Sequence, residues 1–205
     1  RSDFMVVWRS GVDIFGSRVG ASSAFTTPAG ITIANPATGS LDNPSVAWNG
    51  TNYIVTWQDD RNAAASGFDI YGARLSSTAA LLDTLNGVPL ITAHGNQLSP
   101  NVIAGGANLL VTWQDERNFN TGHDIYHARL STSGGALSIT DAGGLPTAKA
   151  ANPQSTPSVA FNGTNYLVVW QDYRVGTAAD LYGARVSPAG VVLDPFGIAI
   201  STATG

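Results

Sequence analysis

One five-residue phrase recurs along this chain at a nearly constant spacing. Residues 57–61 read WQDDR, residues 113–117 read WQDER, and residues 170–174 read WQDYR. A second phrase, DIYGAR or a close variant, follows each copy and ends in an arginine. These arginines, with one from a divergent first copy, stand at positions 18, 74, 129 and 185, so the steps are 56, 55 and 56 residues. A fixed period of this size is typical of propellers and stacked arrays, in which each repeat is one supersecondary unit.

The first copy of the repeat is incomplete. It has Trp8 and then DIFGSR from Asp13, but it lacks the acidic residues and the arginine of the WQDxR phrase. The chain also starts in mid-repeat, at the second strand of the later copies. A single four-stranded unit cannot cover its own apolar faces. We therefore expect one domain over 1–205, with repeats at approximately 1–43 (incomplete), 44–99, 100–156 and 157–205.

Each complete repeat predicts four short antiparallel strands. In the second copy, 44–48 is a short apolar strand, and Asn49-Gly50 predicts a type I′ hairpin turn. Residues 53–58 are mostly apolar on both faces, as in a strand covered from both sides, and 69–75 and 88–92 supply the last two strands. No stretch has a sustained 3.6-residue period. The pattern predicts an all-β fold: a β-propeller of about four four-stranded antiparallel blades, or a part of a larger propeller.

The strand order leaves one sheet edge without a neighbour. The chain supplies three strands and then three sets of four, and the missing member is the first strand of the first blade. An unpaired edge has to be paired or covered. We expect self-association, or another protein chain, to supply the missing strand.

The repeat resembles a known type of blade. WQDxR followed by DIYGARLS is similar to the blade repeat of secreted bacterial β-propeller proteins, and the resemblance covers nearly the whole chain. It implies a propeller fold and an extracellular or cell-surface location. It says little about activity, because such blades occur in lectin-like, adhesive, scaffold and enzyme-associated proteins alike.

Composition removes several classes of partner. Charged residues make up 12% of the chain, and the net charge is −4, without a basic stripe. This argues against nucleic acid and anionic membrane surfaces as partners. No run approaches 18 apolar residues, so the sequence predicts no membrane insertion. The absence of cysteine excludes disulfides and thiolate chemistry.

The acidic and basic residues of the recurring loop are the main candidate site. In a propeller, equivalent loops gather at one end, where carboxylates could bind a sugar or offer hard oxygen ligands to Ca²⁺. The favoured alternative is a structural strut, in which each aspartate accepts hydrogen bonds from loop amides or from its own arginine. A glycosidase pair of carboxylates is disfavoured, because active sites are unique and this motif occurs in triplicate. The candidate binding residues are Asp59, Asp60, Arg61, Asp115, Glu116, Arg117, Asp172, Tyr173 and Arg174.

Arginines and aromatic residues at fixed repeat positions are predicted to be architectural. Arginine suits fixed bidentate pairing, so we expect the arginines at 18, 74, 129 and 185 to pair with the acidic loops. The tryptophans at 8, 57, 113 and 170 are expected to pack between blades. Aromatic residues near turns are better candidates for exposed contacts: Trp48, Phe68, Phe119 and Tyr173. The three histidines show no shared metal-ligand spacing, and no metal site is predicted from them.

The sequence therefore favours a non-catalytic extracellular binding or structural module, which presents propeller loops to a protein partner or to copies of itself. We expect no enzymatic activity and no obligatory cofactor. The alternative is a lectin-like, carbohydrate-binding propeller with repeated glycan sites at the Asp/Arg loops, each beside an exposed aromatic residue.

Overall fold

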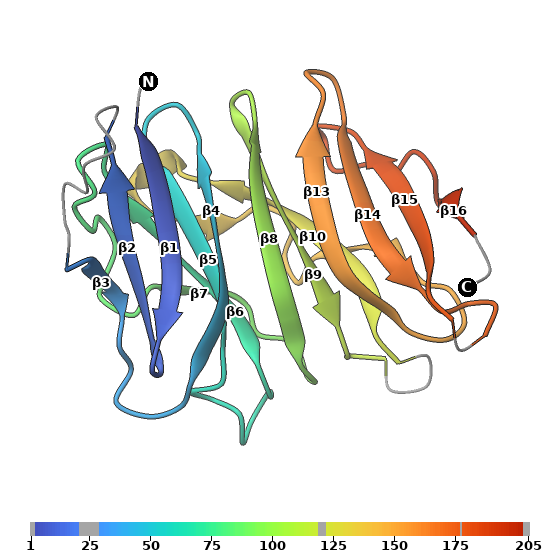
Figure 1. Ribbon diagram of the computed structural model, residues 1–205, viewed down its shortest axis with the longest axis horizontal. Helices are drawn as coiled ribbons and strands as arrows, with labels where there is room; N and C mark the ends of the chain where they lie inside the picture. Colours follow the sequence, from blue (N-terminus) through green and yellow to red (C-terminus); the bar gives the residue numbers. More distant parts are fainter. Residues whose placement is uncertain (1–2, 21–28, 119–121, 177, 203–205) are drawn as a thin grey trace.

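A computed structural model of the chain describes residues 3–20, 29–118, 122–176 and 178–202, and shows four antiparallel sheets side by side (Figure 1). The prediction of an all-β propeller with an incomplete first blade is confirmed. The first sheet has three strands in the order β1-β2-β3, the second β4-β5-β6-β7, and the fourth β13-β14-β15-β16. The third contains β8-β9-β10, with β11 and β12 both paired to β10.

The strands follow the predicted repeat closely. The second sheet consists of β4 (Leu41–Trp48), β5 (Tyr53–Asp59), β6 (Asp69–Leu75) and β7 (Val88–Ile91). The others are β1 (Phe4–Ser10), β2 (Asp13–Val19), β3 (Ile31–Ala34), β8 (Gln97–Gly105), β9 (Asn108–Asp115), β10 (Asp124–Ser131), β11 (Ser138–Ile139), β12 (Leu145–Ala148), β13 (Gln154–Phe161), β14 (Tyr166–Asp172), β15 (Asp180–Val186) and β16 (Ile198–Ser201), with one 3₁₀ turn, η1 (Ser133–Gly135). Within the described ranges, no helix has the length and apolar character needed to cross a membrane.

The first strand of each complete sheet is longer than predicted. The prediction started these strands at a proline, whereas β4, β8 and β13 each begin three residues earlier. A β-bulge explains the difference, because the register shifts across each proline and the residue before it. The bulged residues have left-handed backbone conformations, with φ of 49°, 53° and 49° at Asn43, Ser99 and Thr156. A strand can therefore pass through the proline, which a ladder position would not tolerate.

The hairpin between β4 and β5 also differs from the prediction. A type I′ turn needs positive φ at both central residues, but only Gly50 has it there, at 97°. The loop spans Asn49–Asn52, and the Asn49 side chain accepts hydrogen bonds from the backbone N–H groups of Thr51 and Asn52 at 3.0 and 2.8 Å. An Asx-type loop of four residues thus replaces the two-residue turn.

The core lies between successive sheets. Each sheet has a tryptophan face, named for the tryptophan of its second strand, and an opposite face. The tryptophan face of the second sheet, with Val55 and Trp57, packs on Ile14 and Ile33 of the first. The same arrangement joins the second sheet to the third and the third to the fourth. Burial between neighbouring sheets, which removes apolar area from water, therefore holds the blades together.

The expected packing of the tryptophans between blades is met in three of the four copies. Trp57, Trp113 and Trp170 are 0, 0 and 1% exposed. Trp8 is different: it is half-buried and stacks on Phe15, with ring centroids 6.2 Å apart. For Trp8 the expectation was wrong, because its face of the first sheet has no preceding sheet against it in the described part of the chain.

A buried histidine lies at the contact between the third and fourth sheets. His127 is completely buried, and its Nε2 lies 3.1 Å from the carbonyl oxygen of Gly190. The carbonyl can only accept, so Nε2 carries the proton, and Nδ1 accepts from the Thr147 hydroxyl at 2.7 Å. Burial lowers the pKa of His127 below its usual 6.5. The neutral ring is therefore the form that fits this interface.

The left-handed Thr156 should limit stability. A β-branched residue is unfavourable at positive φ, by roughly 1–2 kcal/mol, whereas asparagine tolerates it. We expect Thr156→Asn to raise the free energy of unfolding by about 1 kcal/mol, measured by urea denaturation. The reciprocal change at the same place in the second sheet, Asn43→Thr, should lower it. Equal stability of both variants and the parent would contradict this account.

His127 should make stability depend on pH. Its pKa is lower in the folded chain than in the unfolded chain, so protons bind the unfolded state more readily. The contribution is complete above the unfolded pKa of about 6.5 and is lost as the pH falls below it. Urea midpoints from pH 7.5 to 5 should fall less steeply for His127→Gln than for the parent. A slope for His127→Gln as steep as that of the parent would contradict this account.

Candidate functional site

Each Asp/Arg loop is built around one completely buried carboxylate. Asp59, Asp115 and Asp172 are 0% exposed. In the second sheet, Asp59 accepts a hydrogen bond from the Trp57 indole at 3.1 Å and from the backbone and side-chain Nε of Arg61 at 3.0 and 2.8 Å. The other two loops repeat these contacts, with indole-to-carboxylate distances of 2.7 and 2.8 Å. The carboxylate therefore fixes the tryptophan and the turn at once, as a strut would.

The arginine of each loop is held on its second side by an aromatic ring. The guanidinium carbons of Arg61, Arg117 and Arg174 lie 4.2, 4.2 and 3.9 Å from the ring centroids of tyrosines in the neighbouring strand. Cation–π contact adds to the ion pair in this geometry. Burial opposes ionisation of Asp172, but hydrogen bonds from Arg174 and Trp170 outweigh it and hold the pKa of Asp172 below its usual range. The pair is thus ionised and fixed.

The remaining candidate residues of the loops also make structural contacts. Backbone N–H groups of Asp60, Glu116 and Tyr173 donate to carbonyls of the segment that leads into each first strand, at 3.2, 2.8 and 3.0 Å. The carboxylate of Glu116 further contacts His123 at 3.0 Å. All nine predicted residues therefore lie in three equivalent loops, and the structure does not gather them into one site. Phe119, predicted as an exposed contact, lies outside the described residues.

The predicted partners of the recurring arginines were wrong. Arg74, Arg129 and Arg185 pair not with the Asp/Arg loops but with aspartates between the third and fourth strands of their own sheets. Arg74, for example, reaches Asp83 at 2.7 Å, and Arg18 pairs with Asp3. The aspartates of the Asp/Arg loops already have an arginine two residues away, which leaves them no free oxygen for a second one. These ion pairs hold the loop between the third and fourth strands, which lies at the end of the third strand opposite to the Asp/Arg loop.

The loops do not suit a calcium ion. Ca²⁺ needs six to eight oxygen ligands, whereas a guanidinium occupies both oxygens of each inner carboxylate. In the described ranges, no group of three or more His, Asp or Glu side chains converges as a metal site would require. The loop residues therefore do not fit Ca²⁺, which the sequence had left as a possible ligand of these carboxylates.

A groove lies beside the Asp/Arg loop of the fourth sheet. It runs between β12 and the β15–β16 loop, as two adjoining hollows of about 200 and 150 Å³. The first is lined by Pro146, Thr147, Ala148, Lys149, Val192 and Pro195, and the second by Ala148, Lys149, Ala150, Arg174, Pro195 and Phe196. We call this surface the outer groove. Its lining combines apolar side chains, such as Pro195 and Val192, with two cationic ones.

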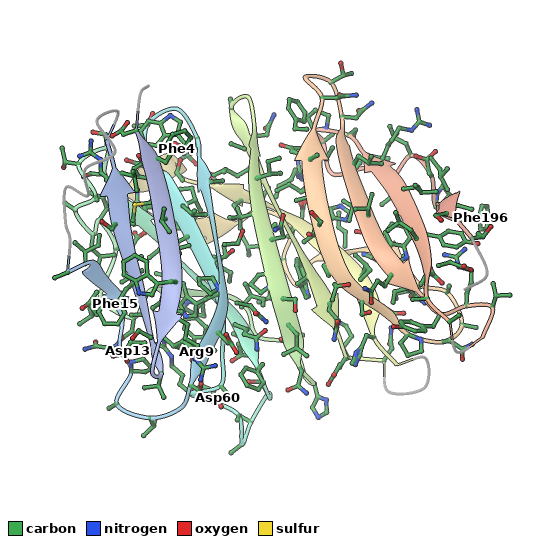
Figure 2. All side chains as sticks on the ribbon, viewed as in Figure 1. Phe4, Arg9, Asp13, Phe15, Asp60 and Phe196 are labelled. Atoms are coloured by element: carbon green, nitrogen blue, oxygen red, sulfur yellow. The ribbon has the colours of Figure 1, made fainter. Side chains whose placement is uncertain are left out.

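Phe196 is the most prominent feature of the outer groove. Its ring is 86% exposed, at the edge of the fourth sheet (Figure 2). Its carbonyl accepts a hydrogen bond from Arg174 at 2.8 Å, and the following Gly197, at φ of 72°, packs on Trp170. These contacts hold the backbone of the turn, and the ring projects outward from it. The corresponding positions of the second and third sheets are Asn86 and Gly143, so the aromatic residue occurs in one copy.

A second, smaller hollow lies at the opposite end of the sheets. It has a volume of about 190 Å³ between β1 and β4, and Trp48 and Tyr53 in its wall have ring centroids 4.8 Å apart. Phe4, 73% exposed, forms part of its rim. Figure 2 shows Phe4 at one end of β1 and Asp60 near the other end, so this hollow is separate from the Asp/Arg loops. Trp48 is thus one predicted aromatic contact that does line a hollow.

Sequence reasoning identified Arg174 but missed Phe196 and Lys149. Both are single residues outside the recurring phrases, and a search for repeats gives weight to what recurs. A comparison of the copies position by position would have found Phe196. The loop between the third and fourth strands of each copy contains a glycine at the same place, and the residue before this glycine is small or polar in the other copies. Lys149 is also the single lysine.

Solved structures with the same fold include glycoside hydrolases. An α-L-arabinofuranosidase from Lactobacillus brevis matches 93% of this chain and 68% of its own, with a TM-score of 0.58 and 9% identity. An endo-arabinase from Bacteroides thetaiotaomicron matches 99% and 77%, at 0.58 and 13%. A thermostable family-43 glycoside hydrolase matches 97% and 75%, at 0.57 and 10%. No protein-family profile and no curated protein matches the sequence significantly.

These comparisons correct the expectation of a non-catalytic module without enzymatic activity. Propellers of this shape carry hydrolases, and the carbohydrate-related alternative accords with them better. The expectation rested on the lack of a unique acidic motif. That argument was weak, because blades converge on one axis, and single carboxylates from different blades can meet without any local motif. At 9–13% identity, the likeness establishes the fold.

The buried carboxylates should be essential for stability. Asp115→Asn leaves Arg117 without its charge partner in a largely buried place, and breaking such a pair costs about 3 kcal/mol or more. We expect a fall of this size in urea denaturation. Glu116→Gln, at the neighbouring half-exposed position, should cost less than 1 kcal/mol, about the value of a surface ion pair. Equal losses for the two variants would contradict the strut role of Asp115.

Proposed function

We propose that this protein is a carbohydrate-active propeller that holds a glycan chain in the outer groove. The observation that carries the proposal is the exposed ring of Phe196 beside Arg174 and Lys149. The solved structures of similar fold act, by their names, on arabinose-containing glycans. We therefore take an arabinan as the first ligand to test, and secretion or surface exposure as the setting in which such a glycan is met.

The aromatic ring supplies the apolar part of the recognition. The face of a sugar ring presents C–H groups, which pack on the flat face of an aromatic side chain. Phe196 has no polar atom that needs a partner, and Pro195 continues the apolar surface along the groove. The bond from Arg174 to the Phe196 carbonyl holds the backbone of the turn, and so the position from which the ring projects.

The cationic side chains supply the polar part. Arg174 uses Nε and one amino group on Asp172 and the other amino group on the Phe196 carbonyl, so its position is set before a ligand arrives. Lys149 is exposed, with its Nζ 5.4 Å from the Tyr126 ring centroid. Its ammonium can donate up to three hydrogen bonds to sugar hydroxyls or to a carboxylated sugar.

Truncation of the aromatic ring should weaken glycan binding. Phe196→Ala removes the stacking surface, and we expect the Kd for arabino-oligosaccharides to rise about fivefold to tenfold, or roughly 1–1.4 kcal/mol. Isothermal titration calorimetry measures the change. Leu85→Ala, which removes an exposed apolar residue from the corresponding loop of the second sheet, should leave binding intact.

The parent protein and its variants can also be assayed for hydrolysis of the glycan. Release of reducing ends from arabinan, with xylan assayed in parallel, would establish processing of the glycan. Binding that Phe196→Ala leaves unchanged, or no binding and no hydrolysis with either glycan, would refute the outer groove as the glycan site. Circular dichroism of each variant shows that the fold is retained.

A further inference from the structure

One face of the fourth sheet is apolar and open. Leu167, Leu181 and Ile200 lie on the face opposite to Trp170, and are 40, 38 and 47% exposed. The strand registers place them where the second sheet has Ile54, Ile70 and Leu90. Those residues are 0, 0 and 6% exposed. The fourth sheet therefore exposes side chains of the kind that the inner sheets bury.

The inner sheets show what covers such a face. In each contact between consecutive sheets, the opposite face of one sheet receives the tryptophan face of the next. Ile54 and Ile70, for example, pack with Val111 and Trp113 of the third sheet. The open face of the fourth sheet is therefore equivalent to the faces that are covered in the three contacts within the chain.

In two of these contacts, between the second and third sheets and between the third and fourth, a glutamine side chain that we call the latch bonds to the backbone of the next sheet. The residue after the tryptophan reaches into the next sheet: Gln58 Oε1 accepts from the backbone N–H of Ser99 at 3.0 Å, and Gln114 Oε1 accepts from that of Thr156 at 3.4 Å. Both donors are the left-handed residues of bulged first strands. Gln171 occupies this place in the fourth sheet and is exposed, and no bulged first strand stands opposite it in the described part of the chain.

We propose that the open face of the fourth sheet is the docking surface for a fifth, complete blade of the same repeat, which continues the ring. A complete blade offers both parts of the contact: a tryptophan face for Leu167, Leu181 and Ile200, and a bulged first strand for Gln171. At the other end of the arc, Val6 of the first sheet is 43% exposed on an open tryptophan face. The first and fourth sheets, which carry these two open faces, lie on opposite sides of the view in Figure 1.

The latch argues against a second copy of this chain as the occupant. The open tryptophan face of a second copy would be that of its first sheet, which has β1-β2-β3 and lacks a bulged first strand. Docking of that sheet would leave Gln171 without its backbone donor. The matched structures also contain more chain than the four sheets, since the match covers 77 and 75% of two of them.

The test extends the chain by one blade. A copy of residues 153–201, appended after Gly205, places five residues between Ser201 and the new first strand, as between Ala148 and Gln154. We expect a higher Tm and slower amide hydrogen exchange over 166–201 than in the 205-residue chain. The control extension carries alanine in place of the copied Trp170, and should lose both effects.

The latch allows a second measurement, whose result a flexible tail that does not dock would leave unchanged. Gln171→Ala should leave the Tm of the 205-residue chain unchanged and lower that of the extended chain, a coupling that a double-mutant cycle measures. Equal effects in the two chains, or exchange over 166–201 that the extension does not slow, would overturn the proposal. So would a dimer of the 205-residue chain in light scattering that Leu167→Lys dissociates, because a second copy would then be the occupant.

Discussion

The buried aspartate that ends each second strand is the constraint on which the blades depend. Asp115, for example, accepts from the indole of Trp113 and from Arg117, so one carboxylate orients the largest core side chain and closes the adjoining turn. An unpaired buried charge would be very unfavourable, whereas this one has every oxygen occupied. The indole in turn packs on a glycine of the third loop: a Cβ at Gly144, where φ is 78°, would collide with the Trp113 ring. Loop, strand and core are therefore positioned together.

The repetition of this unit explains why the recurring residues are architectural. Any residue that must serve three blades in the same way is held by contacts inside its own blade or with the next one. Gln58 and Gln114 bind backbone of the following sheet, and the arginines of the second phrase bind an aspartate within theirs. Features that occur in a single copy are free of this constraint, and the proposed glycan site rests on them. Phe196 and Lys149 belong to this class, and they meet Arg174 at a single groove.

The exposed faces of the first and fourth sheets also follow from the repetition of the blade. A sheet with a neighbour on each side buries both faces, as the second and third sheets do, while the first and fourth each leave one face open. Apolar area exposed in this way is favourable to bury against any surface of matching shape. The repeat specifies that shape, since the tryptophan face and the opposite face already fit one another inside the chain.

Much of the fold could be predicted from the sequence, because it depends on local patterns. The spacing of the phrases gave the number of blades, and alternation with turn residues gave strands such as 69–75, which β6 reproduces to the residue. Deviations occurred where a neighbouring strand decides the backbone. The prediction started the first strands at a proline, whereas a bulge that depends on the paired strand lets each begin three residues earlier. The arginine at 74 was given the wrong aspartate, because pairing depends on which loop lies at its end of the sheet.

The candidate site was predictable only in part, for a related reason. The sequence by itself determined the period, the strand order, the buried tryptophans and the acidic loops, all of which follow from residues close together in the chain. The tertiary structure decided that the loop carboxylates are occupied from within, that Phe196 and Lys149 stand on either side of one groove, and that the fourth sheet has an open face. Contacts between blades bring together residues some 50 positions apart, such as Lys149 and Phe196. The strand count pointed to an unpaired edge, but the spacing does not say which side chains remain exposed once the sheets have packed.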